Sequence, residues 1–352
     1  MIAMTGASSQ ETPRRIAMIL GGIILALLLM ELAARLLVPQ PLKGKVATYD
    51  NRVNATFVHM YDGDPYDTLP PDQRMVYRIN SIGMRGPDRF PDMSDDVVRI
   101  MVLGDSFAFG EGVTLDEAFP SRLEKSLQEQ VKVGVRYQVL NAALSGYGTA
   151  DELARLRDYS QLMRPHVVVV AFTLNDPIPE SDMVPFENDL MNLMATANST
   201  RGSASALYDL ISDRRSDRQR TSEIEAWYRS FYVGERADRW ERSSGDLAAM
   251  AVYCREHDIE LIVAVLPLIY RLDDHPFTDI HGKVTGFCRE QGIQVVDMLP
   301  VLKGIPDQEL WIHPTDHHPN ARAHGMMAEA LVRPILELTS GQVNATTSAG
   351  SR

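Results

Sequence analysis

Short runs of β-branched and apolar residues recur after residue 96, and each is followed by a stretch with apolar residues at helical spacing. Such runs are typical of strands that are buried on both faces of a parallel sheet. The predicted strands are Val97–Leu103, Tyr137–Leu140, Val167–Phe172, Ile259–Leu266 and Ile293–Val296. The predicted helices are Leu115–Gln130, Asp151–Met163, Asp246–His257, Thr278–Gln291 and Ala321–Leu338. This alternation predicts an α/β domain with one parallel sheet, right-handed crossovers and helices on both faces.

Polar residues follow the predicted strands at the points where the strands end. Ser106 follows the first strand, Asn141 and Gly146 follow the second, Asn175 follows the third, and His318 lies in the loop after the fifth. Open parallel sheets bind their ligands beyond the carboxyl ends of the strands. We therefore expect these groups to converge on one edge of the sheet and to form the functional site there.

Two distant segments supply the groups of a nucleophilic site. Residues 104–107 read Gly-Asp-Ser-Phe, and residues 316–320 read Asp-His-His-Pro-Asn. A serine is a weak nucleophile unless an imidazole takes its proton, and a carboxylate improves the imidazole by holding its tautomer. The pair of segments therefore predicts a serine esterase. The Gly-x-Ser-x-Gly pattern of the α/β-hydrolase nucleophile elbow is not present at this serine.

Charge and cysteine content exclude some functions. The net charge of −12, without a basic cluster, argues against a nucleic-acid partner. Cys254 and Cys288 each lie near the end of a predicted helix, so we interpret them as packing thiols, with a disulfide as the alternative.

Histidines crowd one segment near the C-terminus, which raises the alternative of a metal site. The candidate ligands there are His313, Asp316, His317, His318 and His324. Their spacing matches no common zinc pattern, and the serine motif already accounts for His318. We therefore expect no metal and no other cofactor.

An apolar stretch near the N-terminus predicts a membrane segment. After a short N-terminal segment, residues 1–15, the stretch 16–38 gives a helix of about 34 Å, enough for a hydrocarbon core of about 30 Å. We predict an uncleaved anchor, with a cleaved signal peptide as the alternative. Arginines precede the stretch and lysines follow it, so the positive-inside rule leaves the orientation open.

The remaining segments divide the chain further. Residues 39–96 are rich in Pro, Asp and Gly and predict a stalk or a strap over the domain, with a turn at Gly83. The catalytic domain is predicted at 97–338 with a helical insertion at 177–245, and the tail 339–352 is predicted to be disordered.

Aromatic residues cluster near the end of the insertion. We predict that this stripe packs against the core, and the alternative is a platform on which sugars stack. The residues concerned are Trp227, Tyr228, Phe231, Tyr232 and Trp240.

Together these motifs resemble those of the SGNH hydrolases, also called the GDSL-like esterase and lipase superfamily, over residues 97–336. Bacterial membrane-anchored members are the most similar, because of the anchor, the long insertion and the Asn-x-x-Gly-x-Arg tract at Asn80–Arg85. The resemblance implies a three-layer sandwich with a five-stranded parallel sheet of the flavodoxin-like type, preceded by a transmembrane helix. It also implies a single-pass membrane protein with a periplasmic or otherwise extracytoplasmic catalytic domain.

The resemblance assigns a role to each motif residue. Ser106 would be the nucleophile, with its backbone N–H as one oxyanion donor. The backbone N–H of Gly146 and the side-chain amide of Asn175 would be the other two donors. His318 would be the general base, and Asp316 would orient its ring.

The sequence departs from the family pattern at two places. Thr173 stands where the third motif usually has glycine, and we expect it to narrow the pocket floor beside Asn175. Asp316 precedes His318 by two residues, whereas many members have three. His317 is the alternative base, but the His-Pro-Asn order favours His318.

The resemblance predicts hydrolysis of carboxylic esters through an acyl-enzyme. We expect a short acyl group such as acetyl, because no long apolar run in the loops predicts a groove for a longer chain. The substrate would be an ester, including an acylated glycan or lipid. One alternative is an O-acyltransferase that acts on a cell-envelope polysaccharide, and another is a non-catalytic binding module on the same scaffold.

Overall fold

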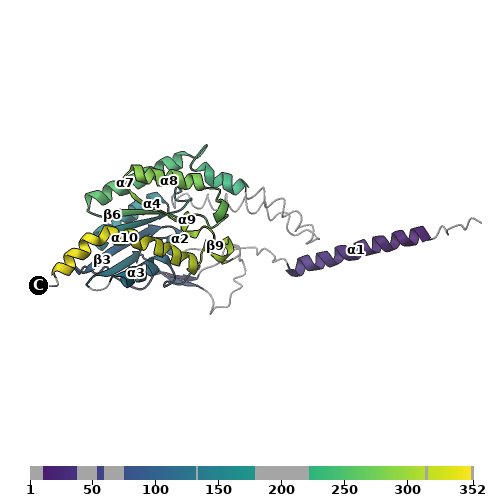
Figure 1. The fold of residues 1–352 in the computed structure, drawn as a ribbon, viewed down its shortest axis with the longest axis horizontal. Helices are drawn as coiled ribbons and strands as arrows, with labels where there is room; N and C mark the ends of the chain where they lie inside the picture. The colour runs from purple at the N-terminus through teal and green to yellow at the C-terminus, as the bar shows by residue number, and fades with distance from the viewer. Residues whose placement is uncertain are drawn as a thin grey trace, which may run out of the picture. The chain divides into compact units, whose positions relative to one another are not determined.

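The chain divides into two compact units, residues 1–41 with 188–224 and residues 42–187 with 225–352. The first unit contains α1 (Glu11–Leu37), and the second contains the sheet (Figure 1). The computed structural model describes residues 11–37, 54–58, 75–131, 134–178, 222–313 and 316–349.

The sheet has five strands, and every neighbouring pair is parallel. Their order across the sheet is β4-β3-β5-β6-β7, which is the 2-1-3-4-5 order of flavodoxin-like folds when only these strands are counted. The fold class predicted from the sequence is confirmed. The strands are β3 (Val97–Gly104), β4 (Arg136–Asn141), β5 (Val167–Phe172), β6 (Glu260–Val265) and β7 (Gln294–Asp297).

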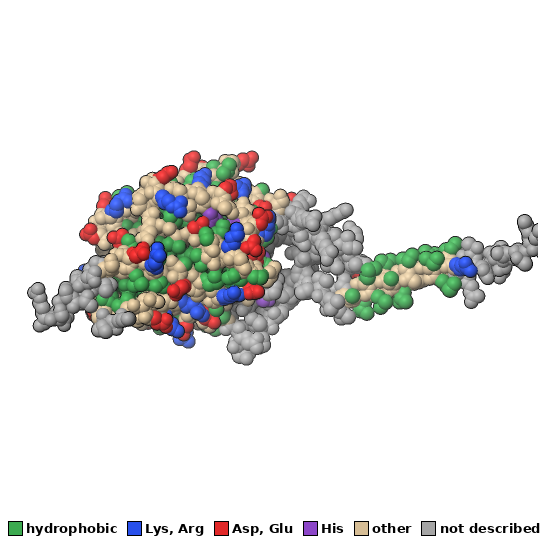
Figure 2. All heavy atoms as spheres, viewed as in Figure 1, with side chains coloured by type: hydrophobic (Ala, Val, Ile, Leu, Met, Phe, Trp, Pro, Cys, Tyr) green, Lys and Arg blue, Asp and Glu red, His purple; other side chains and the backbone are tan. Residues whose placement is uncertain are grey.

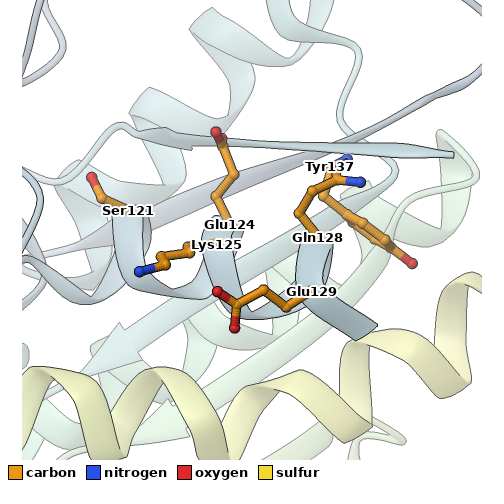
Figure 3. A pocket seen from close by; sticks show the side chains of 6 residues that line it. All are labelled: Ser121, Glu124, Lys125, Gln128, Glu129 and Tyr137. Carbon is orange, nitrogen blue, oxygen red and sulfur yellow. Dashed lines mark hydrogen bonds between the residues drawn. The ribbon is translucent and has the colours of Figure 1, made fainter. Parts of the chain in front are cut away.

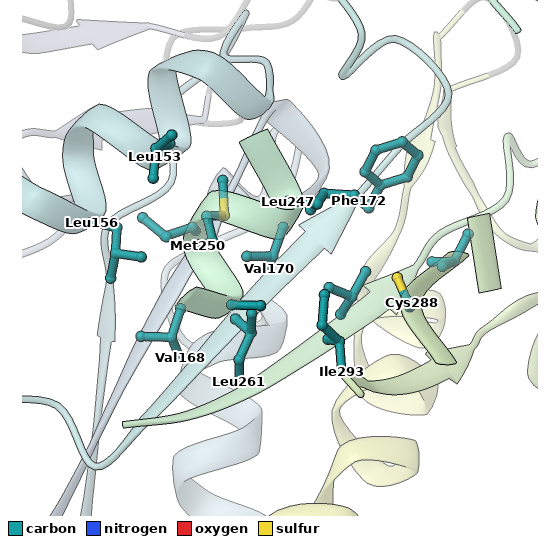
Figure 4. Close-up of a cluster of buried hydrophobic side chains, with 14 of the residues drawn as sticks. Leu153, Leu156, Val168, Val170, Phe172, Leu247, Met250, Leu261, Cys288 and Ile293 are labelled. Atoms are coloured by element: carbon teal, nitrogen blue, oxygen red, sulfur yellow. The ribbon is translucent and has the colours of Figure 1, made fainter. Parts of the chain in front are cut away.

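Helices cover both faces of the sheet and make three layers (Figure 1). Successive strand residues point to opposite faces, so Met101 and Leu103 pack with one group of helices, whereas Ile100 and Val102 pack with the other. The first group is α4 (Thr149–Met163), α7 (Asp238–Glu256) and α8 (Thr278–Glu290), and the second is α3 (Phe119–Gln130) and α10 (Ala321–Ala349). Figure 4 shows the first of these two cores.

Shorter elements complete the second unit. They are β1 (Thr56–Val58), β2 (Val76–Arg78), α2 (Ser106–Phe109), η2 (Leu272–Asp274), α9 (Leu299–Leu302), η3 (Asp307–Glu309), β8 (Trp311–His313) and β9 (Asp316–Pro319). β1 pairs with β2, and β8 pairs with β9, both antiparallel.

Side chains of α3 satisfy the free edge of β4. Glu124 accepts a hydrogen bond from the backbone N–H of Val139 at 2.7 Å, and Gln128 accepts one from that of Tyr137 at 3.1 Å. An exposed strand edge is otherwise a template for pairing with another chain. A hollow of about 340 Å³ lies between these side chains, and no residue of the predicted site lines it (Figure 3). We therefore regard it as part of the edge protection.

The described part of the predicted strap packs into the domain. Tyr77 and Met84 are each 1% exposed, and the Arg85 side chain is buried. Gly83 has the positive φ, +77°, that was predicted for the turn. Residues 39–53 and 59–74 of the strap lie outside the described residues.

Two helices begin more than two residues away from the position that the periodicity predicts. α3 begins at Phe119 and not at Leu115, because Glu117 binds back to the N–H and hydroxyl of Thr114 in a turn that precedes the helix. α7 begins at Asp238, inside the predicted insertion, where acidic residues in its first turn favour a helix start.

The tail prediction is wrong for the described residues, because α10 continues to Ala349. Thr339, predicted to begin a disordered tail, is 1% exposed. Its hydroxyl donates to the Ile335 carbonyl at 2.8 Å and lies 2.9 Å from the Tyr137 hydroxyl. These bonds fix the helix to the sheet edge beyond the predicted end.

The aromatic stripe packs against the core, as predicted. Phe231, Tyr232 and Trp240 are buried in the core that contains α7 and α8, and Trp227 and Tyr228 pack against it. Residues 179–221 of the predicted insertion lie outside the described residues.

The two cysteines are free and buried, so the packing interpretation is confirmed and the disulfide alternative is wrong. Burial raises the pKa of both thiols, Cys254 and Cys288, to about 12, which leaves them unreactive at neutral pH.

The α1 helix has the length and composition to cross a membrane over residues Arg15–Ala33. Its described side chains are almost all exposed, and Figure 2 shows apolar groups along it. A signal sequence near an N-terminus meets the same criterion, so this finding is compatible with both alternatives drawn from the sequence.

Candidate active site

The loop after β3 presents Ser106 at the start of α2. Gly104 has φ +148°, and a Cβ there would lie 2.6 Å from the Cβ of Ala108, so only glycine permits this close turn. The Asp105 carboxylate accepts the N–H of Phe107 at 2.9 Å and caps α2. The Gly-Asp-Ser sequence therefore sets the position of the serine.

The structure brings the predicted nucleophile, base and orienting carboxylate together. The Ser106 Oγ lies 2.9 Å from Nε2 of His318, although the two residues are 212 positions apart in the sequence. On the other side of the ring, Nδ1 lies 2.6 Å from Oδ1 of Asp316. With the Nδ1 proton donated to Asp316, Nε2 is the acceptor for the serine hydroxyl, which is the arrangement that a general base requires.

The two-residue spacing of Asp316 and His318 has a local explanation. Oδ1 of Asp316 accepts both the ring N–H and the backbone N–H of His318, the latter at 3.1 Å. Asn320 then caps α10 by accepting the N–H groups of Arg322 and Ala323. The chain is therefore held on both sides of the histidine.

The neighbouring histidines serve other contacts. The ring of His317 stacks on Trp311, with centroids 3.8 Å apart, while His318 turns toward Ser106. His324 is fully buried on α10 and accepts the N–H of Phe119 at 3.2 Å; burial lowers its pKa to about 3. Among the residues that the structure describes, no three His, Cys, Asp or Glu side chains are placed to hold a metal ion.

The loops after β4 and β5 lie beside Ser106 with their predicted oxyanion donors. The Leu144 N–H donates to the Gly104 carbonyl at 3.1 Å, and this bond holds the loop that carries Gly146. Gly146 has φ +82°, and the described residues offer its N–H no hydrogen-bond acceptor. The Asn175 amide donates to Oδ2 of Asp105 at 2.9 Å, and among the described residues its second N–H has no acceptor.

Asn141, also predicted to lie at this edge, holds the loops together. Its amide donates to the carbonyls of Ala108 and Phe109, each at 3.2 Å, and its oxygen accepts the N–H of Ala143 at 3.1 Å. Since all its polar atoms are engaged within the protein, it joins the loop after β4 to that after β3.

Thr173 is completely buried, so its side chain does not narrow the pocket floor beside Asn175 as the sequence predicts. Its hydroxyl lies 2.8 Å from Asp105 Oδ2, 2.9 Å from Asn175 Oδ1 and 2.7 Å from Asp176 Oδ1. A hydroxyl has a single proton, so a partner carboxyl must be protonated and donate to it. The threonine thus joins the first and third motifs beneath the site.

Burial raises the pKa of three carboxyl groups in this region. Burial raises the pKa of Asp105. Burial also raises the pKa of Asp176, and the nearby groups Glu152 and Asp105 add to that increase. Burial, with Asp105 next, also raises the pKa of Glu152 well above the ordinary glutamate value. A carboxyl kept neutral in this way can donate the hydrogen bond that Thr173 requires.

Glu111 is a site residue that the sequence analysis does not identify. It is 1% exposed, its Oε2 lies 3.6 Å from Nε2 of His318, and its Oε1 accepts the Ser145 hydroxyl. The only signal for it in the sequence is the pair of glycines, Gly110 and Gly112, on either side of a carboxylate shortly after the nucleophile.

Several solved structures are similar to this chain at low sequence identity. TesA shares 20% identity, with 68% of this chain and 99% of that chain covered and a TM-score of 0.41. An acetylxylan esterase from Geobacillus stearothermophilus, solved as a catalytic mutant, shares 16% identity, with 68% and 94% covered and a TM-score of 0.42. A two-domain esterase active on acetylated mannans shares 13% identity, with 69% and 50% covered and a TM-score of 0.42.

None of the curated protein sequences compared with this chain matches it significantly. The model of the GDSL-like lipase/acylhydrolase family, in contrast, matches residues 102–326, which is more than half of the chain and includes both segments of the site. The chain therefore belongs to the GDSL-like lipase/acylhydrolase family of ester-bond hydrolases.

Proposed function

We propose that this protein is a serine esterase that removes short acyl groups, such as acetyl, through an acyl-enzyme. Ser106 is the nucleophile, His318 the general base and Asp316 the group that orients the base. The observation that carries the proposal is the continuous contact from Ser106 Oγ to His318 Nε2, 2.9 Å, and from Nδ1 to Asp316, 2.6 Å. This geometry matches what nucleophilic catalysis by serine requires.

The reaction proceeds in two halves. Ser106 Oγ bonds to the ester carbonyl carbon while its proton passes to Nε2 of His318, and the carbonyl oxygen becomes an oxyanion. The N–H groups of Ser106 and Gly146 and the free N–H of Asn175 stabilise that charge. His318 then gives the proton to the leaving alcohol, and the acyl group stays on Ser106. Water, deprotonated by His318, releases the acid and restores the serine.

The polar surroundings of Ser106 favour a short acyl group. The described groups that bond to Ser106 are polar, namely the His318 ring at its Oγ and the backbone N–H groups of Gly110 and Glu111 at its carbonyl, and none of these contacts supplies an apolar groove for a long acyl chain. An acetyl group needs no apolar groove.

A chain-length series tests this function. The full-length protein in detergent is assayed with p-nitrophenyl acetate, butyrate and octanoate and with acetylated xylan, beside Ser106→Ala as the matched control. We expect hydrolysis to be fastest for acetate and absent in the variant, and a fluorophosphonate probe to label Ser106. An enzyme that is not labelled and releases no nitrophenol from any ester contradicts the proposal. If the enzyme transfers the acyl group to added glycan in preference to water, the protein is an O-acyltransferase and not an esterase.

We also propose that α1 anchors the protein in a membrane, with the catalytic domain, residues 97–338, on the extracytoplasmic side. The support is the apolar stretch Arg15–Ala33. The test is extraction of membranes with alkaline carbonate, together with N-terminal sequencing of the product. An intact N-terminus in the membrane fraction supports the anchor, whereas a soluble product that begins after residue 38 indicates a cleaved signal peptide.

A further inference from the structure

Glu111 contacts both the loop that carries the proposed oxyanion donor Gly146 and the ring of the proposed base, His318. Its backbone N–H donates to the Ser106 carbonyl at 3.1 Å, so the residue follows directly from the nucleophile turn. One carboxylate oxygen accepts the Ser145 hydroxyl, and the other lies 3.6 Å from Nε2 of His318. A distance of 3.6 Å is too long for a hydrogen bond, so Nε2 stays paired with Ser106 at 2.9 Å.

The backbone around Glu111 is built to point this side chain inward. Gly110 and Gly112 have φ of +89° and +76°, values that favour glycine. Arg85, from the Asn80–Arg85 tract of the strap, donates to the carbonyls of Phe109 and Gly110, each at 2.6 Å. Tyr77 accepts the Gly112 N–H at 2.6 Å. The strap therefore clamps the loop that presents this carboxylate.

We propose that Glu111 is a positioning residue of this active site, which holds the oxyanion loop through Ser145 and stabilises the positive charge that His318 acquires on taking the Ser106 proton. Ser145 is the residue directly before Gly146. The hydrogen bond from the Ser145 hydroxyl to Glu111 therefore fixes the direction in which the backbone N–H of Gly146 points. The inference rests on the proposed function, because it assigns a role in the same proton transfer.

The negative charge of Glu111 acts mainly on the protonated form of the His318 ring. A carboxylate at 3.6 Å gains little from a neutral His318 ring. When Nε2 takes the proton, the imidazolium lies between Asp316 at Nδ1 and Glu111 near Nε2, so the attraction is greater in the transition state than in the ground state. Since Glu111 is 1% exposed, it acts on the base from within the protein and not on the substrate.

Other titratable groups face this pair. Asp105, on the nucleophile turn, and His324, on α10, interact electrostatically with His318. Tyr77 and Arg85, on the strap, interact with Glu111. Burial, with Glu111 next, raises the pKa of Tyr77, and burial lowers that of Arg85 to about 10, so near neutral pH Tyr77 is uncharged and Arg85 cationic. Arg85 thus offsets the cost of burying the Glu111 carboxylate.

The test is the pH profile of Glu111→Gln with p-nitrophenyl acetate, in the full-length protein in detergent. Glutamine still accepts the Ser145 hydroxyl but carries no charge. A carboxylate within 4–6 Å stabilises the protonated form of a histidine and raises its pKa by at least about one unit. We therefore expect the acidic limb of kcat/KM to move about one unit toward lower pH, and kcat to fall about tenfold with KM unchanged.

Two further variants separate the parts of the inference. Ser145→Ala keeps the charge and loses the bond, so kcat should fall without a shift of the acidic limb. Glu117→Gln removes a carboxylate from the same segment, where it only caps Thr114, and should change neither quantity.

The inference is overturned if the E111Q enzyme has the same kcat as the wild-type enzyme and the same acidic limb in its pH profile of kcat/KM. If E111Q does not fold, Glu111→Asp keeps the charge but withdraws it by one methylene group. We then expect a lower kcat with the limb preserved, and a wild-type kcat in E111D overturns the inference equally. Failure of the proposed function is a different result, because the wild-type enzyme would then be inactive and unlabelled by fluorophosphonate.

Discussion

Glu152 should make the stability of this protein depend on pH, and Glu152→Gln should remove that dependence. The side chain lies on α4, is 0% exposed, and neither carboxyl oxygen has a hydrogen-bond partner among the described residues. Burial raises its pKa well above the ordinary value, with the charge of Asp105 as the next cause. The folded protein therefore holds Glu152 neutral over a pH range in which the unfolded chain ionises it.

The sign follows from proton linkage. Below pH about 4.3, the pKa of a glutamate in the unfolded chain, Glu152 is protonated in both the folded and the unfolded protein. Its contribution to the stability of the fold is then fully present. As the pH rises from there toward the folded pKa, the unfolded chain is favoured by about 1.4 kcal/mol per pH unit. Glutamine does not titrate. Between the unfolded and the folded pKa of Glu152, the free energy of unfolding of the variant therefore rises relative to that of the wild-type protein by this amount for each pH unit. A difference of 1 kcal/mol moves the melting temperature by about 2–4 °C in a domain of this size.

The assay is thermal unfolding of the full-length protein in detergent at pH 4.5, 5.5, 6.5 and 7.5. We expect the melting temperatures of the wild-type protein and Glu152→Gln to diverge upward from pH 4.5, with the variant the more stable at pH 7.5. The matched control is Glu241→Gln, which removes an exposed carboxylate from the first turn of α7. Two curves that stay parallel across this range would refute the reasoning.

Three other substitutions test the site. Asp316→Asn should lower kcat/KM about 10³–10⁴-fold, because the amide no longer holds the His318 ring in the required tautomer, and a loss below tenfold in ester hydrolysis would contradict this. Asn175→Ala should lower kcat about 10²–10³-fold with little change in KM, since one oxyanion donor is lost; a rise in KM alone would show a role in binding only. Gly112→Ala places a Cβ 2.1 Å from Ile312 at φ +76°, so it should lower both the melting temperature and kcat/KM by displacing β8, and an unchanged melting curve would refute that.

The strands were predictable because each is buried on both faces. β5 has the predicted bounds, Val167–Phe172; β3 differs from prediction by one residue at one end, and β4, β6 and β7 differ by one residue at each end. A continuous apolar run ends where the chain leaves the core, so hydrophobicity alone marks the boundary. The βα repeat predicts the parallel sheet but not the strand order, which the family resemblance implied; in a parallel sheet the carboxyl ends of the strands bring Ser106 and Asn175 to the same edge.

Helix ends were less predictable because partners far away in the sequence decide them. α10 continues beyond Leu338 since Thr339 meets Tyr137, which is 202 positions earlier in the chain. α7 begins at Asp238, among residues whose composition resembles that of the insertion before it. In both cases the local sequence permits the observed structure but does not require it.

The site shows the same division between local and distant causes. Asp316, His318 and Ser106 carry their own signals, because each lies in a short motif whose residue types suit one reaction. Glu111 has no such signal, since its role depends on Ser145, 34 positions later, and on a loop whose carbonyls are held by Arg85, about 25 positions earlier.

The placement of a buried carboxylate beside the proposed base is therefore a property of the assembled loops, and coordinates are needed to find it. The Asn80–Arg85 tract, which resembles a family motif without an evident chemical task, gains a task only when those loops are seen together. Its arginine holds the loop of Glu111, its asparagine accepts the N–H groups of Ile82 and Met84 to shape the turn, and the strap thereby contributes to the active site without contacting the reacting atoms.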